Sequence, residues 1–284
     1  MTSARAGLAL GRPGSGRRTV VDEARATTQR VARTFGLACR LLPRAVRDDV
    51  YLLYLVFRTL DDLVDDARPE APARVEAVAA WAEARVGDRT QEVEILDAID
   101  ARHVLPRDAV ADFCAGMRQD LAGETFATEA DVDRYCYRAA GTVGLVMTAV
   151  LGARDPRRAG RAAVALGVAM QRTNMLRDID EDLAAGRVYV AQAAVERHGS
   201  LRPGERAELL REQIAYADRL YERGIAGIGE LRRGRGAVAA AAAMYREILR
   251  RIERDGYGAT DRRASVPLSR KLLVGSRAAA QRRP

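Results

Sequence analysis

The clearest pattern of hydrophobic and polar positions lies between Val50 and Asp66. Apolar side chains recur there every three or four residues, which is the spacing of one face of an α-helix. The apolar positions are Val50, Leu53, Tyr54, Phe57, Leu60 and Val64. The stretch ends in aspartates, and Asp61 and Asp65 share one face because they are one turn apart. Like charges at this spacing destabilise an isolated helix by roughly 0.2–0.5 kcal/mol, so something positive is expected to bind there.

A second acidic helix strengthens this interpretation, because the first alone fits a solvated helix end equally well. Its polar positions are separated by three or four residues and share one stripe. They are Gln171, Asn174, Asp178 and Asp182. Two carboxylate-bearing helices that face each other across a bundle can hold metal between them. Mg²⁺ binds through carboxylates together with substrate phosphates, so the pair predicts a metal site for a phosphorylated substrate, most simply a diphosphate.

The rest of the chain is predicted to form helices joined by turns, with no clear alternating strand. Hydrophobic residues make up 48% of the chain and aromatic residues only 5%, which favours packed helices over sheets. We expect an all-α, single-domain fold over residues 20–280, after a disordered tail over residues 1–19. A first helix is predicted from Val21 to about Leu41, and Thr128-Glu-Ala-Asp131 is typical of a capping box.

Charge and hydropathy narrow the class of partner. The net charge is +8 and the isoelectric point is about 9.8, a balance that can indicate nucleic acid or a membrane surface. The arginines are scattered among acidic residues, Lys271 is the single lysine, and no basic run alternates with aromatic residues. Nucleic-acid binding is therefore not expected. No apolar run is long enough to span a membrane, so we expect a cytoplasmic protein with a peripheral contact to a membrane surface.

The cysteines and histidines indicate neither disulfides nor zinc. Cys39, Cys114 and Cys136 are odd in number and widely spaced, which is typical of reduced, buried thiols. His103 and His198 are far apart in the sequence and lack neighbouring ligands, so a zinc site is not predicted.

Three motifs together resemble those of the phytoene and squalene synthases, the head-to-head prenyl diphosphate synthases. Two are the aspartate-rich stretches and the third lies between them. In chain order, the matching stretches are Tyr54–Asp66, Tyr135–Gly144, and Asn174–Asp182 followed by Gly186–Tyr189. The resemblance runs from about Thr34 to Lys271. It implies an isoprenoid-synthase-type helical bundle with a central active-site cavity.

The resemblance also implies roles for particular residues. The implied metal ligands, for Mg²⁺ or Mn²⁺ in its place, are Asp61, Asp62, Asp65, Asn174, Asp178 and Asp182. The implied catalytic residues are Tyr54, Tyr135, Tyr245, Arg58 and Arg177. The implied substrate-binding residues are Thr34, Phe35, Arg58, Gly141, Gly144, Gln171, Asn174, Arg177, Arg187 and Arg262. The family usually shows Ser-x-Ser-Phe before the first motif, and Ala32 here removes one of those hydroxyls.

Gly141 and Gly144 lie inside a predicted helix, where each glycine costs roughly 0.8–1 kcal/mol relative to alanine. Two explanations stay open. One is close packing against another helix. The other, which the resemblance favours, is a kink whose carbonyl dipoles face a carbocation and whose missing side chains leave room for a prenyl chain.

The implied activity is the Mg²⁺-dependent condensation of two geranylgeranyl diphosphates to phytoene, through a cyclopropylcarbinyl diphosphate, in carotenoid biosynthesis. The alternatives use farnesyl diphosphate and make squalene, presqualene diphosphate, hydroxysqualene or dehydrosqualene, with NADPH required only for squalene. A terpene cyclase is less favoured because such pockets are usually aromatic-rich, and this chain has four Phe and one Trp. A non-catalytic assembly protein is less favoured because both aspartate motifs are intact. The substrate chain length stays open, as does the choice between monomer and homodimer.

Overall fold

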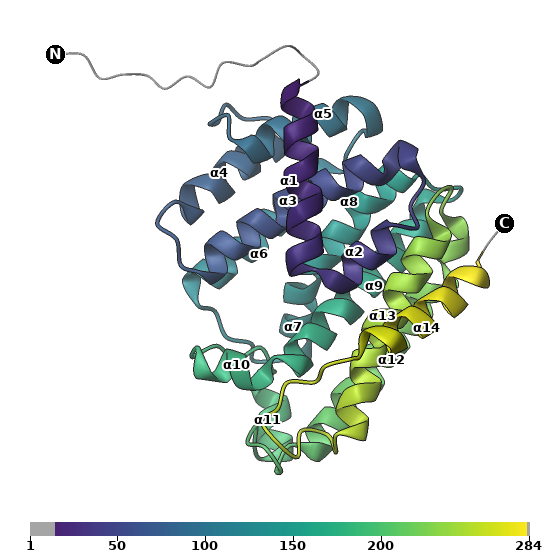
Figure 1. The fold of residues 1–284 in the computed structure, drawn as a ribbon. Coiled ribbons are helices and arrows are strands. Elements are labelled where there is room, and N and C mark those ends of the chain that lie inside the picture. Colours follow the sequence, from purple (N-terminus) through teal and green to yellow (C-terminus); the bar gives the residue numbers. More distant parts are fainter. Residues whose placement is uncertain (1–14, 283–284) are drawn as a thin grey trace.

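Helix α9 runs through the middle of a bundle and packs against α8, α12 and α13 (Figure 1). The computed structural model describes residues 15–282. The helices are α1 (Ser15–Val31), α2 (Arg33–Cys39), α3 (Arg44–Asp65), α4 (Ala71–Ala82), α5 (Gln91–His103), α6 (Arg107–Ala122), α7 (Glu129–Cys136), α8 (Thr142–Leu151), α9 (Pro156–Arg177), α10 (Ile179–Ala184), α11 (Gln192–His198), α12 (Ala207–Ala226), α13 (Arg235–Arg254) and α14 (Leu268–Ala280). A π-helical turn (Tyr137–Gly141) joins α7 to α8, and a short 3₁₀ helix (Ile228–Glu230) follows α12.

The predicted all-α fold is confirmed. Within residues 15–282, the extended pairing consists of one isolated bridge between Ala153 and Leu231. No helix in that part of the chain is long and apolar enough to cross a membrane. The three cysteines are buried and free of disulfides, as the sequence predicts.

Local sequence explains where the two aspartate-bearing helices begin. Pro43 occupies the N-cap of α3. At the start of α9, the Asp155 side chain accepts hydrogen bonds from the backbone N–H groups of Arg157 and Arg158. Pro156 is the first residue of that helix, where its missing N–H costs nothing. The predicted capping box is also present, with Thr128 and Asp131 bonding each other's backbone at the start of α7.

The N-terminal region differs from its prediction in two ways. Helix α1 begins at Ser15, so residues 15–19 are helical where the sequence predicts a tail, while residues 1–14 lie outside the described residues. Arginine favours helix and no proline follows Pro13 in this stretch, which explains the early start. The predicted helix from Val21 to Leu41 is broken at Ala32, whose ψ of 61° is not helical. The break turns α2 so that Phe35 reaches the interior.

A buried arginine fixes α9 against two other helices. Arg172 is only 3% exposed and donates to Asp133 at 2.9 Å, to Gln213 at 2.8 Å and to Glu129 at 2.9 Å. These partners belong to α7 and α12, so the cluster holds three helices in one register. Removing one partner of a buried ion pair typically costs about 3–5 kcal/mol. The cluster therefore stabilises the helix that carries the second aspartate motif.

Candidate active site

A cavity of about 330 Å³ lies among α2, α3, α8, α9 and α13. Its α9 wall extends from Ala159 to Asn174, which spans roughly 22 Å at 1.5 Å per residue. The lining residues with charged or amide side chains lie toward the C-terminal ends of α3 and α9, and they are Arg58, Asp61, Gln171 and Asn174. The other end is apolar and includes Leu42, Leu151, Ile228 and Leu231. The cavity is thus a long apolar compartment with charge and hydrogen-bonding groups at one end.

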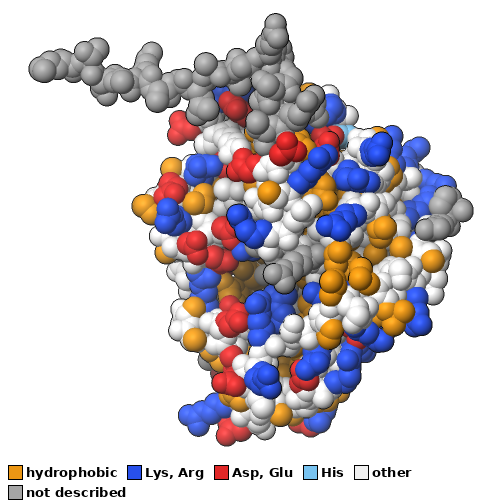
Figure 2. Space-filling model, viewed as in Figure 1, with side chains coloured by type: hydrophobic (Ala, Val, Ile, Leu, Met, Phe, Trp, Pro, Cys, Tyr) orange, Lys and Arg blue, Asp and Glu red, His pale blue; other side chains and the backbone are white. Residues whose placement is uncertain are grey.

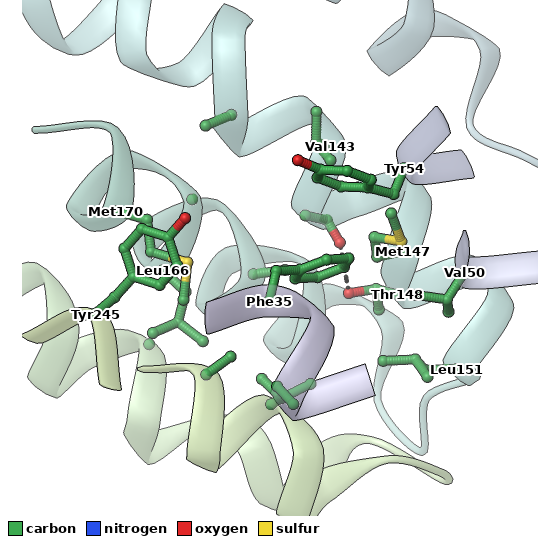
Figure 3. A pocket seen from close by; sticks show the side chains of 18 of the residues that line it. Phe35, Val50, Tyr54, Val143, Met147, Thr148, Leu151, Leu166, Met170 and Tyr245 are labelled. Carbon is green, nitrogen blue, oxygen red and sulfur yellow. Dashed lines mark hydrogen bonds between the residues drawn. The ribbon is translucent and has the colours of Figure 1, made fainter. Parts of the chain in front are cut away.

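Aromatic side chains from three helices stand around this compartment (Figure 3). Phe35 of α2 stacks on Tyr54 of α3, with ring centroids 4.9 Å apart and an interplanar angle of 26°. Tyr245 of α13 lies beside Leu166 and Met170 in the same view. Burial raises the pKa of Tyr54 and of Tyr245 above the ordinary value for tyrosine. Both hydroxyls therefore stay protonated at neutral pH, and both rings can present a π face to the cavity.

Arginines hold the carboxylates at the polar end. Arg58 donates to Asp61 at 2.8 Å and also pairs with Asp62. The Arg177 guanidinium donates to the neighbouring Asp178 at 2.7 and 2.5 Å. Burial alone would raise the pKa of Asp178, but the hydrogen bonds and positive charges of Arg177 and Arg263 together outweigh it, and the pKa is lowered. This end of the cavity therefore carries closely interleaved charges of both signs.

The two aspartate motifs are electrostatically coupled. Burial, and after it the charge of Asp65, raises the pKa of Asp61 to about 7. The Asp61 side chain is 39% exposed, but it lines the cavity. Burial and then Asp178 raise the pKa of Asp182 to about 6, and Asp65 contributes to the same shift. The carboxylates of both motifs thus lie near one another with incompletely offset negative charge.

Figure 2 shows one face of the molecule hollowed, with hydrophobic side chains inside the hollow and both acidic and basic side chains along its lower edge. Arg187, which follows the second motif, links it to the first, since it donates to the Asp65 carboxylate at 2.6 Å and to the Asp65 carbonyl at 3.0 Å. Its position follows from Gly186, whose φ of +75° reverses the chain after α10.

The sequence matches a known protein family. The family model for squalene/phytoene synthase covers residues 28–270. The chain belongs to the squalene/phytoene synthase family. It is 36% identical to the phytoene synthase of Thermus thermophilus over 85% of this chain and 86% of that protein. It is 34% identical to the 15-cis-phytoene synthase of Synechocystis, over 88% and 81% respectively. A solved dehydrosqualene synthase superposes with a TM-score of 0.85 at 25% identity, covering 95% of this chain and 99% of that one.

Membership of the squalene/phytoene synthase family confirms the predicted fold and the predicted enzyme class, a prenyltransferase. Several residues implied by the resemblance line the cavity, and they are Phe35, Tyr54, Arg58, Asp61, Gly144, Gln171, Asn174 and Tyr245. Others lie outside its lining, and they are Thr34, Asp62, Asp65, Tyr135, Gly141, Arg177, Asp178, Asp182, Arg187 and Arg262. Most of this second group belongs to the charged end, where the ion pairs described above gather them.

Arg262 and its neighbour Arg263 have different surroundings. Arg263 donates to Asp178 at 2.8 Å and lies 3.5 Å from Glu181. Arg262 instead borders a separate small pocket with Arg206 and Asp255. Two adjacent arginines in a loop cannot be told apart from the sequence. Arg263 therefore forms an ion pair with the second aspartate motif, while Arg262 lines a pocket that Arg177 and Asp180 of the same motif also line.

The sequence analysis also missed a carboxylate beside the first motif. Asp120, at the end of α6, accepts hydrogen bonds from the Tyr135 hydroxyl at 3.0 Å and the Tyr189 hydroxyl at 3.3 Å. The two rings stack with centroids 5.3 Å apart. Burial raises the pKa of Asp120 to about 6. No charge pattern marks Asp120 in the sequence, because its partners come from α7 and from the loop after α10.

The two glycines between the motifs serve close packing as well as a helix irregularity. The expected irregularity is the π-helical turn Tyr137–Gly141. A Cβ on Gly144 would lie 2.7 Å from the Ala163 carbonyl oxygen of α9, and one on Gly141 would lie 3.0 Å from the Tyr137 ring. Both missing side chains therefore face protein, which supports the packing explanation for these two positions.

The charged end fits a divalent cation. Asn174 Oδ1 is a buried oxygen that has no hydrogen-bond partner within residues 15–282. The raised pKa values of Asp61 and Asp182 mark negative charge that a cation would offset. Among the described residues, no three His, Cys, Asp or Glu side chains already form a metal-holding group. Arginines bind Asp65 and Asp178 in this structure, so coordination would require those ion pairs to open.

Proposed function

We propose that the chain is a phytoene synthase, which joins two geranylgeranyl diphosphates head to head. The observation that supports this most directly is the long apolar cavity with arginines and carboxylates at one end. Such a compartment can enclose a prenyl chain while its diphosphate remains at the polar end. The phytoene synthases of Thermus thermophilus and Synechocystis, which match most of this chain, support the same activity.

The depth and lining of the cavity favour the longer substrate. The first half of the α9 wall presents mainly small residues, namely Ala159, Ala162, Ala163 and Gly167, and the second half presents larger ones such as Met170 and Gln171. The small side chains leave the compartment open at the end that is far from the charged groups. The farnesyl-using reactions remain the alternative, because one structural neighbour is a dehydrosqualene synthase.

The diphosphate would bind at the charged end. Asp61, Asp65, Asn174, Asp178 and Asp182, with Asp62 beside them, are the residues that we expect to hold Mg²⁺. The metal would offset the charge of the departing diphosphate. The guanidinium groups of Arg58, Arg177, Arg187 and Arg263 would exchange their carboxylate partners for diphosphate oxygens. They would stabilise the leaving group as the C1–O bond breaks and its electron pair leaves with the oxygen.

The apolar walls would protect the allylic cation from water, which would otherwise convert it to an alcohol. The faces of Tyr54, Phe35 and Tyr245 can each stabilise a cation by about 0.5–2 kcal/mol. The double bond of the second substrate then forms a bond to C1 of the cation, and loss of a proton closes a cyclopropane. Loss of the second diphosphate, rearrangement and loss of another proton give phytoene without a reductant. The hydrogen-bonded pair Tyr135–Asp120 is the proton acceptor that we propose for these losses.

The test is a product assay with purified protein and Mg²⁺. Geranylgeranyl or farnesyl diphosphate is supplied, each with and without NADPH, and the organic extract is analysed by mass spectrometry. A C40 hydrocarbon from geranylgeranyl diphosphate without NADPH is the expected result. A C30 product from farnesyl diphosphate alone would assign the chain to the squalene or dehydrosqualene reactions, with NADPH dependence separating them. A cyclic C15 or C20 product would indicate a terpene cyclase.

A peripheral contact with a membrane is part of the same proposal. Both substrates carry long apolar chains, and the product is a hydrocarbon that water does not dissolve. An enzyme that delivers such a product gains from contact with the bilayer.

A further inference from the structure

Helix α14 carries apolar side chains on its outer face. Leu268, Leu272 and Leu273 are 59%, 51% and 41% exposed, respectively. The opposite face packs on α13, where Val274 and Ala279 contact a cluster that contains Ala240 and Met244. The exposed leucines are therefore not needed to attach the helix. Exposed leucines grouped on one helix indicate a surface that contacts another protein or a membrane.

The charge around this face has one sign. Residues 262–282 contain six basic side chains and no acidic one. Arg263 pairs with Asp178, Arg270 pairs with Glu247, and Arg282 donates to the Ile225 carbonyl. Arg277 is exposed on α14 itself. An exposed apolar face flanked by basic residues and lacking acids is the pattern of a helix that lies in the interface of an anionic bilayer.

A second element continues the same surface. Leu37 of α2 joins the cluster that holds Val274 and Ala279, and Leu41, one turn further on, is 52% exposed. Figure 1 places α2 and α14 on the same side of the molecule, over α13. In the matching region of Figure 2, hydrophobic and basic side chains are intermingled, with few acidic ones among them. The surface is therefore wider than one helix.

This surface lies one helix away from the cavity. Helix α13 lines the cavity with Ala237, Val238, Ala241 and Tyr245. Its Ala241 also belongs to the cluster beneath α14. A bilayer against α14 would thus be separated from the prenyl compartment by a wall of small side chains.

We propose that Leu268, Leu272, Leu273 and Arg277 of α14, together with Leu41, form a docking surface for an anionic lipid bilayer. This assignment deepens the membrane contact proposed above, but it does not depend on which product the enzyme forms. A second copy of the chain is a poorer occupant. Two such faces would bring like charges together with no acidic residue between 262 and 282 to offset them.

The test compares two double variants of the full-length chain. L272E/R277Q changes the docking surface. V86E/R89Q makes the same chemical changes in the connection between α4 and α5, where Val86 is fully exposed and Arg89 is 67% exposed. Neither pair lines the cavity. Both variants are checked by circular dichroism and thermal unfolding, and L272S/L273S provides a second surface variant that keeps the charge.

Binding is measured by sedimentation with phosphatidylglycerol–phosphatidylcholine vesicles and with phosphatidylcholine vesicles. We expect wild-type protein and V86E/R89Q to bind the anionic vesicles, less so at high salt. L272E/R277Q should bind about tenfold more weakly or worse, and L272S/L273S should also be weaker. In detergent micelles all four proteins should form product at similar rates.

The proposal is overturned if wild-type protein does not bind anionic vesicles or if both surface variants bind as wild type does. It is also overturned if α14 substitutions convert a vesicle-indifferent dimer into a monomer in analytical ultracentrifugation. Absence of product from wild type in micelles would instead refute the proposed reaction while leaving the binding result intact.

Discussion

The Arg187 guanidinium donates a hydrogen bond to the Asp65 carboxylate at 2.6 Å and so connects two residues that are 122 positions apart in the chain. Asp65 ends α3, and Arg187 follows α10. The contact therefore closes the charged end of the cavity by joining the two aspartate motifs. In the proposed reaction both groups exchange partners, the carboxylate for Mg²⁺ and the guanidinium for diphosphate.

Replacing Arg187 by Gln should separate these roles from fold stability. The side chains of Arg187 and Asp65 are 34% and 44% exposed, so the pair should contribute less than about 1 kcal/mol to the free energy of unfolding. Turnover should fall roughly 10–100-fold, because one charge-assisted hydrogen bond to the diphosphate is lost. Urea denaturation and steady-state kinetics measure the two effects. The control is Arg89→Gln, which removes a more exposed pair, with Asp97, outside the site. Unchanged turnover in Arg187→Gln would remove Arg187 from the diphosphate site.

Alanine at Asp61 or Asp178 should abolish turnover while the helical circular dichroism spectrum remains. Each substitution removes a carboxylate expected to hold Mg²⁺, and loss of such electrostatic stabilisation commonly costs about 10²–10³-fold or more in rate. Asp88→Ala, in the exposed connection before α5, is the matched control. Full activity in either site variant would contradict the metal assignment.

The free energy of unfolding should fall as the pH rises toward neutrality, partly through Asp61. In the folded chain, burial and then Asp65 raise the pKa of Asp61 from 3.8 to about 7. The folded state therefore holds this proton more tightly than the unfolded chain, so stability is lost between the unfolded and folded pKa values as the proton leaves. Asp61→Asn should be more stable than wild type at pH 8 and similar to it below pH ~4.

This comparison is made by chemical denaturation without added metal. The raised pKa values of Asp120 and Asp182, both about 6, act in the same direction and remain in the variant. Asp88→Asn serves as the control and should shift stability little at either pH. A variant less stable than wild type at pH 8 would contradict the raised pKa of Asp61.

Gly167→Ala should destabilise the fold. A Cβ at this position would lie 2.4 Å from the Ala140 carbonyl oxygen and 2.8 Å from the Gly141 Cα, so α9 would have to move away from the π-helical turn. Overpacking of this kind typically costs about 1–3 kcal/mol. Gly229→Ala is the control because a Cβ there has no neighbour within 4 Å. Equal urea midpoints for the two variants would show that the close approach tolerates a methyl group.

Thr148→Phe should shift substrate preference toward the shorter chain. Thr148 lies beside Phe35, Val50 and Leu151 in the cavity, away from the polar end (Figure 3). A phenyl ring there shortens the apolar compartment. We expect the ratio of geranylgeranyl to farnesyl turnover to fall by about tenfold or more, with farnesyl diphosphate in the same variant as the internal reference. An unchanged ratio would place the prenyl chain elsewhere.

The sequence predicted the elements with strong local signals. The helical period of α3 and the Thr128 capping box depend on nearby residues, and both are present. The aspartate motifs also led to the family, which the comparisons confirm. Local sequence patterns were therefore sufficient to predict the fold class and the two aspartate-bearing helices of the charged end.

Other features depend on tertiary contacts, which a short stretch of the sequence does not reveal. The break at Ala32 places Phe35 in the cavity, yet the surrounding sequence contains neither proline nor a turn signal. Asp120 becomes notable only when Tyr135 and Tyr189 converge on it. The ion pair of Arg263 with Asp178 was not predicted, because the direction of a loop side chain is set by the packed structure.

The π-helical turn Tyr137–Gly141 joins α7 and α8 into one continuous helix, and it sets how the α8 half is rotated relative to the α7 half. Ahead of it, Tyr135 points to Asp120 at the charged end; beyond it, Met147 and Thr148 face the prenyl compartment. If the same residues adopted α geometry, one half would rotate against the other by roughly 100°. The π-helical turn therefore accommodates one residue more than an α-helical turn while it keeps Tyr135 and Thr148 aligned with their two sites.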